Sequence, residues 1–199
     1  MPYPLAMPDA ESSQTKGEQR QAQILAAARR LLVVDGYDHF ILREVATRVG
    51  VTLGNLQYYY ATRDDLLEAV IRAEFETNQR DIAASSAGKR PAREKLSSIV
   101  RHLIDVWAKE GGRVYVVMSL LAIHHARFAR LHREIYGAFY DSLLPVLAEL
   151  RPRATPAELW RTARLVTTLV DGALVQVPGR TLLADTVHTA LVIAERRSR

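Results

Sequence analysis

ILREVATRVGVTLGNLQYYY, residues 41–60, contains two short helical patterns separated by a glycine. Leu42, Val45 and Val49 lie on one face of the first pattern, and Gly50 supplies a backbone suited to a tight turn. The second pattern lacks an apolar face broad enough for burial, because it carries polar and aromatic side chains instead. A helix-turn-helix unit of this kind places its second helix in the major groove of DNA. The spacing therefore favours a DNA-binding protein.

Helical spacing recurs along the rest of the chain, and strand-like alternation does not persist. Ile24, Ala28 and Leu31 form an apolar stripe on a first helix, expected over residues 18–35. Gly36 follows that helix at the position where a left-handed C-terminal cap is favoured. The pattern indicates an all-α fold.

Capping and breaking residues place the later helices. Thr62 to Asp65 resembles a capping box that opens a fourth helix, and residues 155–158 combine an N-cap threonine, a proline and a capping-box glutamate. Pro145 is expected to kink or interrupt a long helix over residues 129–150.

The domain organisation follows from these helices and from the breaks between them. We expect a flexible N-terminal extension over residues 1–17, a three-helix helix-turn-helix DNA-binding domain over residues 18–63, and a larger C-terminal helical domain for ligand binding and dimerisation over residues 64–199.

Composition narrows the possible environments and chemistries. The chain of 199 residues has no cysteine, a net charge of +5 and no apolar run longer than that at residues 114–123, which is too short for a bilayer. The N-terminus lacks the pattern of a signal peptide, so we expect a cytoplasmic, nucleoid-associated protein without a membrane partner. Residues 16–63 hold seven basic and four acidic side chains, a mild preference for anionic partners.

The sequence contains no P-loop, Gly-rich dinucleotide turn, HExxH motif or serine-centred elbow, so an enzyme is not expected. His124 and His125 are adjacent on a helix and point about 100° apart, which disfavours chelation by the pair. Asp185 and His188 have a metal-ligand spacing on one helix, but no second motif of that type exists to complete a di-iron site. We expect neither a metal nor a cofactor.

The helix that begins at Pro156 is apolar on more than one side, which indicates a second partner besides its own core. Together with the last helix it is expected to form a four-helix interface between two subunits. The alternative is that both helices are buried within one subunit. The residues assigned to the dimer interface are Leu159, Ala163, Val166, Val170, Ala173, Val177, Leu183, Val187 and Leu191. Leu165, Leu169, Gly172 and Gln176 form a second line beside them.

Residues 24–71 resemble the tetracycline-repressor (TetR) family of bacterial regulators. The resemblance is carried by fixed spacing among Gly36-Tyr37, Val45-Ala46, Val49-Gly50-Val51-Thr52, Gly54-Asn55-Leu56, Tyr58-Tyr59-Tyr60, Thr62-Arg63 and Leu66-Leu67. It implies a helical dimer in which three helices bind DNA and the others enclose a ligand pocket and form the interface.

The resemblance also implies the DNA contacts, which are expected at Arg43, Thr52, Leu53, Gly54, Asn55, Gln57, Tyr58, Tyr59 and Arg63. Their chemistry agrees, because Asn55 and Gln57 can pair with base edges and the hydroxyls can contact phosphates. The chain departs from the family pattern at Ile41, which removes a helix cap, and at Gln57, where a tyrosine is common. Tyr60 is expected to be in the core.

The ligand pocket is expected to be apolar with a few polar groups that orient the ligand. Its candidate residues are Trp107, Tyr115, Met118, Leu121, His125, Tyr136, Phe139, Tyr140, Thr167 and Asp171. The hypothesis is a dimeric regulator, most simply a repressor, that binds a palindromic double-stranded operator and is released by a small-molecule effector. The alternative is a helical ligand-binding or nucleoid-associated protein without a specific operator. The effector, the operator and the choice between repression and activation stay open.

Overall fold

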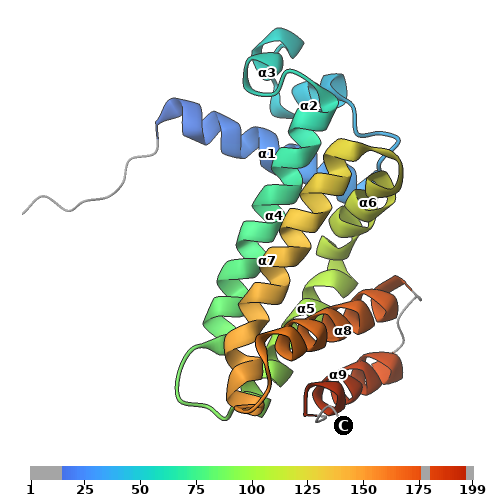
Figure 1. The fold of residues 1–199 in the computed structure, drawn as a ribbon. Helices are drawn as coiled ribbons and strands as arrows, with labels where there is room; N and C mark the ends of the chain where they lie inside the picture. Colours follow the sequence, from blue (N-terminus) through green and yellow to red (C-terminus); the bar gives the residue numbers. More distant parts are fainter. Residues whose placement is uncertain (1–14, 176–179, 196–199) are drawn as a thin grey trace, which may run out of the picture.

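The computed structural model describes residues 15–175 and 180–195, and within them the chain is helical throughout, without strands. The helices are α1 (Lys16–Val34), α2 (Leu42–Val49), α3 (Leu53–Tyr59), α4 (Arg63–Ser86), α5 (Ala92–Lys109), α6 (Gly111–His124), α7 (Ala126–Leu150), α8 (Pro156–Val175) and α9 (Arg180–Glu195). Figure 1 shows α2 and α3 at one end of the molecule and the pair α8 and α9 at the other, with the long helices α4 and α7 running between them. No helix in the described part of the chain could cross a membrane.

Capping residues set the ends of the first helices. α1 begins two residues earlier than expected, because Thr15 and Glu18 form a capping box in which the Glu18 carboxylate accepts from the Thr15 N–H at 2.7 Å. The rest of the predicted extension, residues 1–14, lies outside the described residues. Ile41 occupies the N-cap of α2 without a side-chain hydrogen bond, as its apolar side chain requires. Gly50 ends α2 with φ of 73°, which confirms the predicted turn.

The first three helices contribute to the hydrophobic core that continues through the rest of the molecule. Ile24, Leu31, Val45 and Leu56 are fully buried, so α1, α2 and α3 each contribute to one apolar centre. Tyr60 is also buried, which confirms its predicted place in the core. Leu56 is the fully buried residue of α3, whereas Gly54, Asn55, Gln57 and Tyr58 of that helix are exposed.

α4 joins the two domains as one continuous helix. It begins with the predicted capping box at Thr62 and Asp65, where the Thr62 hydroxyl accepts from the Asp65 N–H at 3.1 Å. Its first half packs against α1 and its whole length lies beside α7 (Figure 1). α7 runs without interruption from Ala126 to Leu150, so Pro145 does not break it. Of the two predicted outcomes, a kink or an interruption, the interruption does not occur, and Pro145 lies on the exposed face of the helix.

The predicted dimer-interface residues require a correction. Seven of them are buried inside this single chain, where α8 and α9 pack on each other and on α5 and α7. These seven are Leu159, Ala163, Val166, Val170, Ala173, Val187 and Leu191. Val177 and the side chain of Leu183 lie outside the described residues. Periodicity identified a buried line, but it could not tell burial within a subunit from burial between subunits.

In the second line on α8, Leu165 is exposed, Leu169 and Gly172 are partly buried, and Gln176 lies outside the described residues. Leu165 is 50% exposed and Val175 is 66% exposed, with the exposed Thr168 between them. An apolar side chain exposed to this extent is unremarkable alone, but Leu165, Thr168 and Val175 are three and seven residues apart, which places them on one helix face.

Candidate DNA-binding surface and ligand pocket

α3 is a short helix with polar side chains at its surface, and a side-chain cap and one buried leucine fix it in place. The Thr52 hydroxyl accepts from the Asn55 N–H at 3.2 Å and caps the helix, while Leu56 anchors it in the core with no exposed surface. Asn55, Gln57 and Tyr58 are exposed, and the Tyr58 side chain is 82% exposed. An exposed tyrosine on a helix this well capped is available for a partner.

The remaining predicted contacts on α2 and α3 differ in exposure. Gly54 and Thr52 are exposed, whereas Leu53 and Tyr59 are partly buried, with Tyr59 packed edge-on against Tyr58 at 5.3 Å between ring centres. Tyr59, a predicted DNA contact, is therefore only partly available at the surface. Arg43 is exposed and forms no ion pair with any described residue, so its charge faces solvent.

Arg63 has a structural role that the sequence did not reveal. Its guanidinium donates to the carbonyls of Phe40 and Tyr37, both at 2.5 Å, and lies 4.0 Å from the centre of the Tyr37 ring. It therefore holds the connection between α1 and α2 against the start of α4. The predicted phosphate contact stays a prediction, and it would have to use a guanidinium already engaged with two backbone oxygens.

The cations nearest the turn are also paired internally. Arg48 binds Asp35 at 2.9 Å and Glu44 at 3.3 Å, and the hydrogen bond from Arg48 lowers the pKa of the Asp35 carboxyl. The described helix-turn-helix surface is consequently polar and aromatic, with Arg43 as its free charge.

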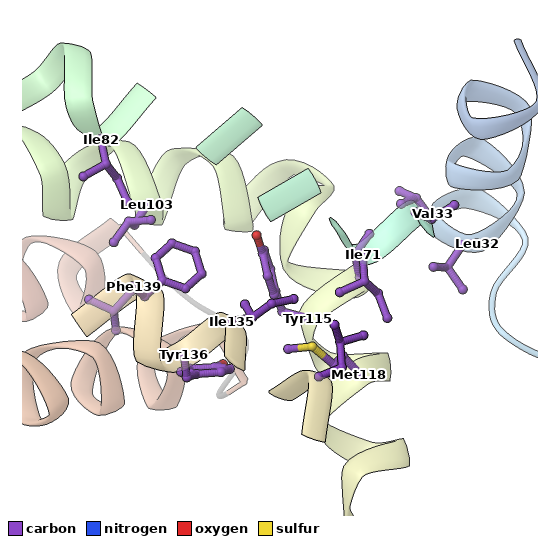
Figure 2. Close-up of a cluster of buried hydrophobic side chains, with 14 of the residues drawn as sticks. Leu32, Val33, Ile71, Ile82, Leu103, Tyr115, Met118, Ile135, Tyr136 and Phe139 are labelled. Carbon is purple, nitrogen blue, oxygen red and sulfur yellow. The ribbon is translucent and has the colours of Figure 1, made fainter. Parts of the chain in front are cut away.

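A narrow cavity lies in the larger domain between α4, α5, α7 and α8. Its empty volume is about 340 Å³ including the mouth, and the enclosed part has room for about one water molecule. The residues that line it are Ile82, Leu103, Tyr136, Phe139, Leu143, Thr167, Val170 and Asp171. Figure 2 shows Ile82 of α4, Leu103 of α5, and Tyr136 and Phe139 of α7 in this region.

Four of the ten predicted pocket residues line this cavity: Tyr136, Phe139, Thr167 and Asp171. Tyr115 lies one layer away with its ring 5.8 Å from that of Phe139, and the Tyr140 ring lies 6.1 Å from that of Tyr136.

Three other predicted pocket residues lie elsewhere. Met118 and Leu121 are buried in the core without lining the cavity. His125 is exposed at the junction of α6 and α7, so its assignment to the pocket was wrong. The side chain of Trp107 lies outside the described residues.

Sequence reasoning missed Ile82, Leu103, Leu143 and Val170 as lining residues. They are ordinary apolar positions on four different helices, and Val170 was assigned to the dimer interface. Nothing local distinguishes them from other core residues, because a cavity depends on how helices meet.

Asp171 is the ionisable group of the cavity lining. The Tyr136 hydroxyl interacts with its carboxylate, and Ser119 of α6 interacts with Tyr136. Burial raises the pKa of the Asp171 carboxyl to about 6, and the bond from Tyr136 only partly offsets that effect. No described lysine or arginine forms an ion pair with it.

A metal site has no support in the described residues, where no cluster of three or more histidine, aspartate or glutamate side chains could hold an ion. Asp185 and His188 are both exposed on α9.

Comparison with known proteins identifies the group to which this architecture belongs. Residues 24–70 match the family described as bacterial regulatory proteins, tetR family. Residues 92–191 match the C-terminal region of BetI-type transcriptional repressors. The chain belongs to the TetR family.

Other TetR-type regulators resemble it over most of their length. The HTH-type transcriptional regulator BetI of Paraburkholderia phymatum is 27% identical over 162 residues, which cover 78% of this chain and 79% of that protein. An uncharacterized HTH-type transcriptional regulator of Xanthobacter autotrophicus is 27% identical over 184 residues, which cover 88% of each chain.

Solved TetR structures share the fold. A TetR-family transcriptional regulator from Streptomyces coelicolor superposes with a TM-score of 0.74 at 17% identity, covering 88% of this chain and 94% of that one. A TetR transcription regulator from Haloarcula marismortui gives a TM-score of 0.72 at 20% identity, covering 89% and 97%. The predicted family, helical fold and helix-turn-helix domain are therefore confirmed, and TetR proteins are DNA-binding transcription regulators and not enzymes.

Proposed function

We propose that this regulator is a cytoplasmic repressor, which binds a palindromic operator as a dimer and leaves it when a small molecule occupies the α4–α8 cavity. The observation that carries the DNA-binding part is α3, a capped helix whose Asn55, Gln57 and Tyr58 are exposed while Leu56 is buried. Amide and hydroxyl groups of this kind read base edges and phosphates in the major groove.

A selection experiment tests this function. Wild-type protein would enrich duplexes from a random-sequence DNA library, and an enriched palindrome is expected. Gln57→Ala and Tyr58→Ala should then weaken binding to that duplex by about tenfold or more, since a good base contact is worth roughly 1–3 kcal/mol. His188→Ala, which truncates an exposed side chain on α9, is the matched control and should bind normally.

The alternative is a protein that packs the nucleoid without a specific operator. It predicts equal affinity for the enriched duplex and for random DNA, because phosphate contacts carry no sequence information. Equal affinities, or normal binding by both α3 variants, would contradict the operator-binding regulator.

The cavity favours a small organic cation as the effector. Asp171 is a partly buried carboxylate among apolar and neutral side chains, and without a cationic partner its ionised form is destabilised. A bound ammonium group would stabilise that charge, and the rings of Tyr136 and Phe139 would contact its apolar part. The cavity is narrow, so binding would also have to move α7 and α8 apart.

Butylammonium, butanol and butyrate are suitable probes because they differ mainly in charge. Butylammonium should raise the thermal unfolding temperature of the wild type at pH 7.5 but not that of Asp171→Asn. Equal stabilisation by butanol would show that charge plays no part, and stabilisation of both proteins by butylammonium would place the cation elsewhere.

A further inference from the structure

The surface of the α7–α8 hairpin carries a tryptophan beside a tyrosine and an acid. Trp160 of α8 contacts Tyr140 of α7, with the two ring centres 4.9 Å apart and the ring planes meeting at 75°. The indole N–H of Trp160 also donates to the carboxylate of Asp141 at 3.0 Å. We call the three side chains Tyr140, Asp141 and Trp160 the outer aromatic site.

The turn between α7 and α8 brings these residues together. α7 ends at Leu150 and α8 begins at Pro156, so the chain folds back on itself after a short connection. The Arg151 guanidinium donates to the Thr162 hydroxyl at 2.9 Å, which ties the turn to the first part of α8. The two helices pack against each other beyond this turn, and the outer aromatic site therefore sits on a well-supported part of the fold.

The outer aromatic site is open to solvent. The Trp160 side chain is 37% exposed, Asp141 is exposed, and Tyr140 is half-buried. Asp141 forms no ion pair with any residue in the described part of the chain. A carboxylate can accept about four hydrogen bonds, so the single indole N–H leaves Asp141 able to bind a cation.

A row of rings connects the outer aromatic site with the cavity. The Tyr140 ring lies 6.1 Å from the Tyr136 ring, and Tyr136 lines the cavity together with Asp171. Tyr136 and Tyr140 are four residues apart on α7, so they share one face of that helix. The row therefore runs from the exposed Trp160 to the cavity that contains the Asp171 carboxylate.

The charges near Tyr140 favour a cation over an anion. Burial and the Asp171 carboxylate raise the pKa of the Tyr140 hydroxyl, and the Arg164 guanidinium partly offsets this effect. Asp141 follows Tyr140 directly in the chain, so two carboxylates and one guanidinium lie near the ring. The faces of aromatic rings attract cations, and walls of aromatic rings bind alkylated ammonium groups in particular.

We propose that the outer aromatic site binds an alkylated ammonium group in the corner formed by the Tyr140 and Trp160 rings, with Asp141 as its counter-ion. A cationic effector would make its first contact here, one row of rings away from Asp171. That role rests on the cavity of the proposed function, whereas binding at the outer aromatic site does not require Asp171.

Nuclear magnetic resonance of the full-length protein tests this site with tetramethylammonium chloride as the probe. The chain has two tryptophans, and comparison with Trp160→Phe identifies the indole N–H signal of Trp160. Titration at constant ionic strength should move this signal saturably, because the cation contacts both the ring and the carboxylate that accepts from the indole. tert-Butanol, a neutral molecule of similar shape, should leave the signal nearly unchanged.

Three variants assign the response to individual side chains. Tyr140→Leu should raise the dissociation constant for tetramethylammonium by about threefold or more, the effect of one cation–π contact, whereas Tyr140→Phe keeps the ring and should bind like the wild type. Asp141→Asn should weaken binding by about two- to fivefold, the range of an exposed ion pair. Asp185→Asn, which removes a carboxylate exposed on α9, is the matched control and should bind normally. If Tyr140→Leu does not fold, the comparison of Asp141→Asn with Asp185→Asn decides.

Several results would overturn the outer aromatic site. No saturable movement of the Trp160 signal, or an equal response to tert-butanol, would show that it does not recognise a cation. Unchanged binding by Asp141→Asn, or loss of the response in Asp171→Asn, would place the cation elsewhere. A Trp160 response that persists while butylammonium fails to stabilise the wild type would contradict the cationic effector of the cavity and leave the outer aromatic site supported.

Discussion

Sequence analysis identified Asp171 as a pocket residue, but it could not predict how the fold changes the pKa of the carboxyl group. Its ordinary pKa of 3.8 rises to about 6 because the larger domain buries it. A carboxyl whose pKa is higher in the folded state costs stability when it ionises. That cost is absent below the unfolded-state pKa near 4, grows between about pH 4 and 6, and is complete above the folded-state value.

Asp171→Asn should therefore stabilise the protein at pH 7.5, by up to about 3 kcal/mol from a shift of this size. The gain should shrink toward zero as the pH falls below about 4. Urea unfolding of both proteins across pH 4 to 8 measures the difference. Asp141→Asn, which replaces a more exposed acid on α7, should show no such pH-dependent gain. A constant difference at every pH would contradict the assignment of the buried ionisation to Asp171.

For Arg63, the family resemblance identified a position of interest but did not reveal the role of this side chain in the fold. The resemblance marks it as a phosphate contact, whereas the structure uses it to bind two backbone carbonyls and the Tyr37 ring. Those carbonyls belong to residues 23 and 26 positions earlier in the chain, so no local pattern could reveal the contact.

Arg63→Met should reduce the free energy of unfolding by roughly 2–3 kcal/mol, because it removes charge-assisted bonds and leaves the Tyr37 and Phe40 carbonyls without that donor. Arg43→Met removes an exposed, unpaired arginine and should change stability by less than about 0.5 kcal/mol. Urea unfolding of the two variants gives the comparison. Equal stabilities would mean that Arg63 is free to bind phosphate and is not part of the fold.

At the scale of a helix, capping signals and apolar periodicity predicted most elements. The boxes at Thr62 and Thr155 and the turn at Gly50 need only neighbouring residues, so sequence was sufficient for them. The uninterrupted path of α7 through Pro145 was not predictable in the same way, because a proline inside a helix removes a backbone hydrogen bond and commonly ends or kinks the helix.

α3 itself carries no charge, which has a consequence for how binding depends on salt. Each phosphate neutralised by a cation contributes about −0.9 to the slope of log affinity against log salt, whereas uncharged groups contribute nothing. Arg43→Met should make this slope less negative by about 1 per subunit on the selected duplex. Tyr58→Phe keeps the charge unchanged, so it should alter affinity while leaving the slope as it is. A slope unaffected by Arg43→Met would place the phosphate contacts on other residues.

At the scale of the molecule, the choice between the two apolar lines of α8 needed tertiary structure. Leu159, Ala163 and Val166 continue the core of one subunit, whereas Leu165 and Val175 stay exposed on α8. That helix lies at the end of the molecule away from α3 (Figure 1). If two subunits paired through Leu165 and Val175, both α3 helices would lie on the same side of the dimer. They could then enter successive major grooves of DNA, which lie about 34 Å apart.

Leu165→Glu should therefore weaken a dimer, since it places a charge in a self-complementary apolar interface that occurs once in each subunit. Sedimentation velocity at micromolar concentrations should show dimers for the wild type and mainly monomers for the variant, with unchanged helical circular dichroism. Val34→Glu is the matched control, because Val34 is 60% exposed at the end of α1 and belongs to the other domain. Two subunits bind a palindrome together, so loss of the dimer should also reduce operator affinity. Leu165→Glu should therefore weaken operator binding as much as Tyr58→Ala does, although Leu165 does not contact DNA. A variant that stays dimeric would move the interface to another face, and a monomer that still binds the palindrome tightly would contradict two-fold recognition.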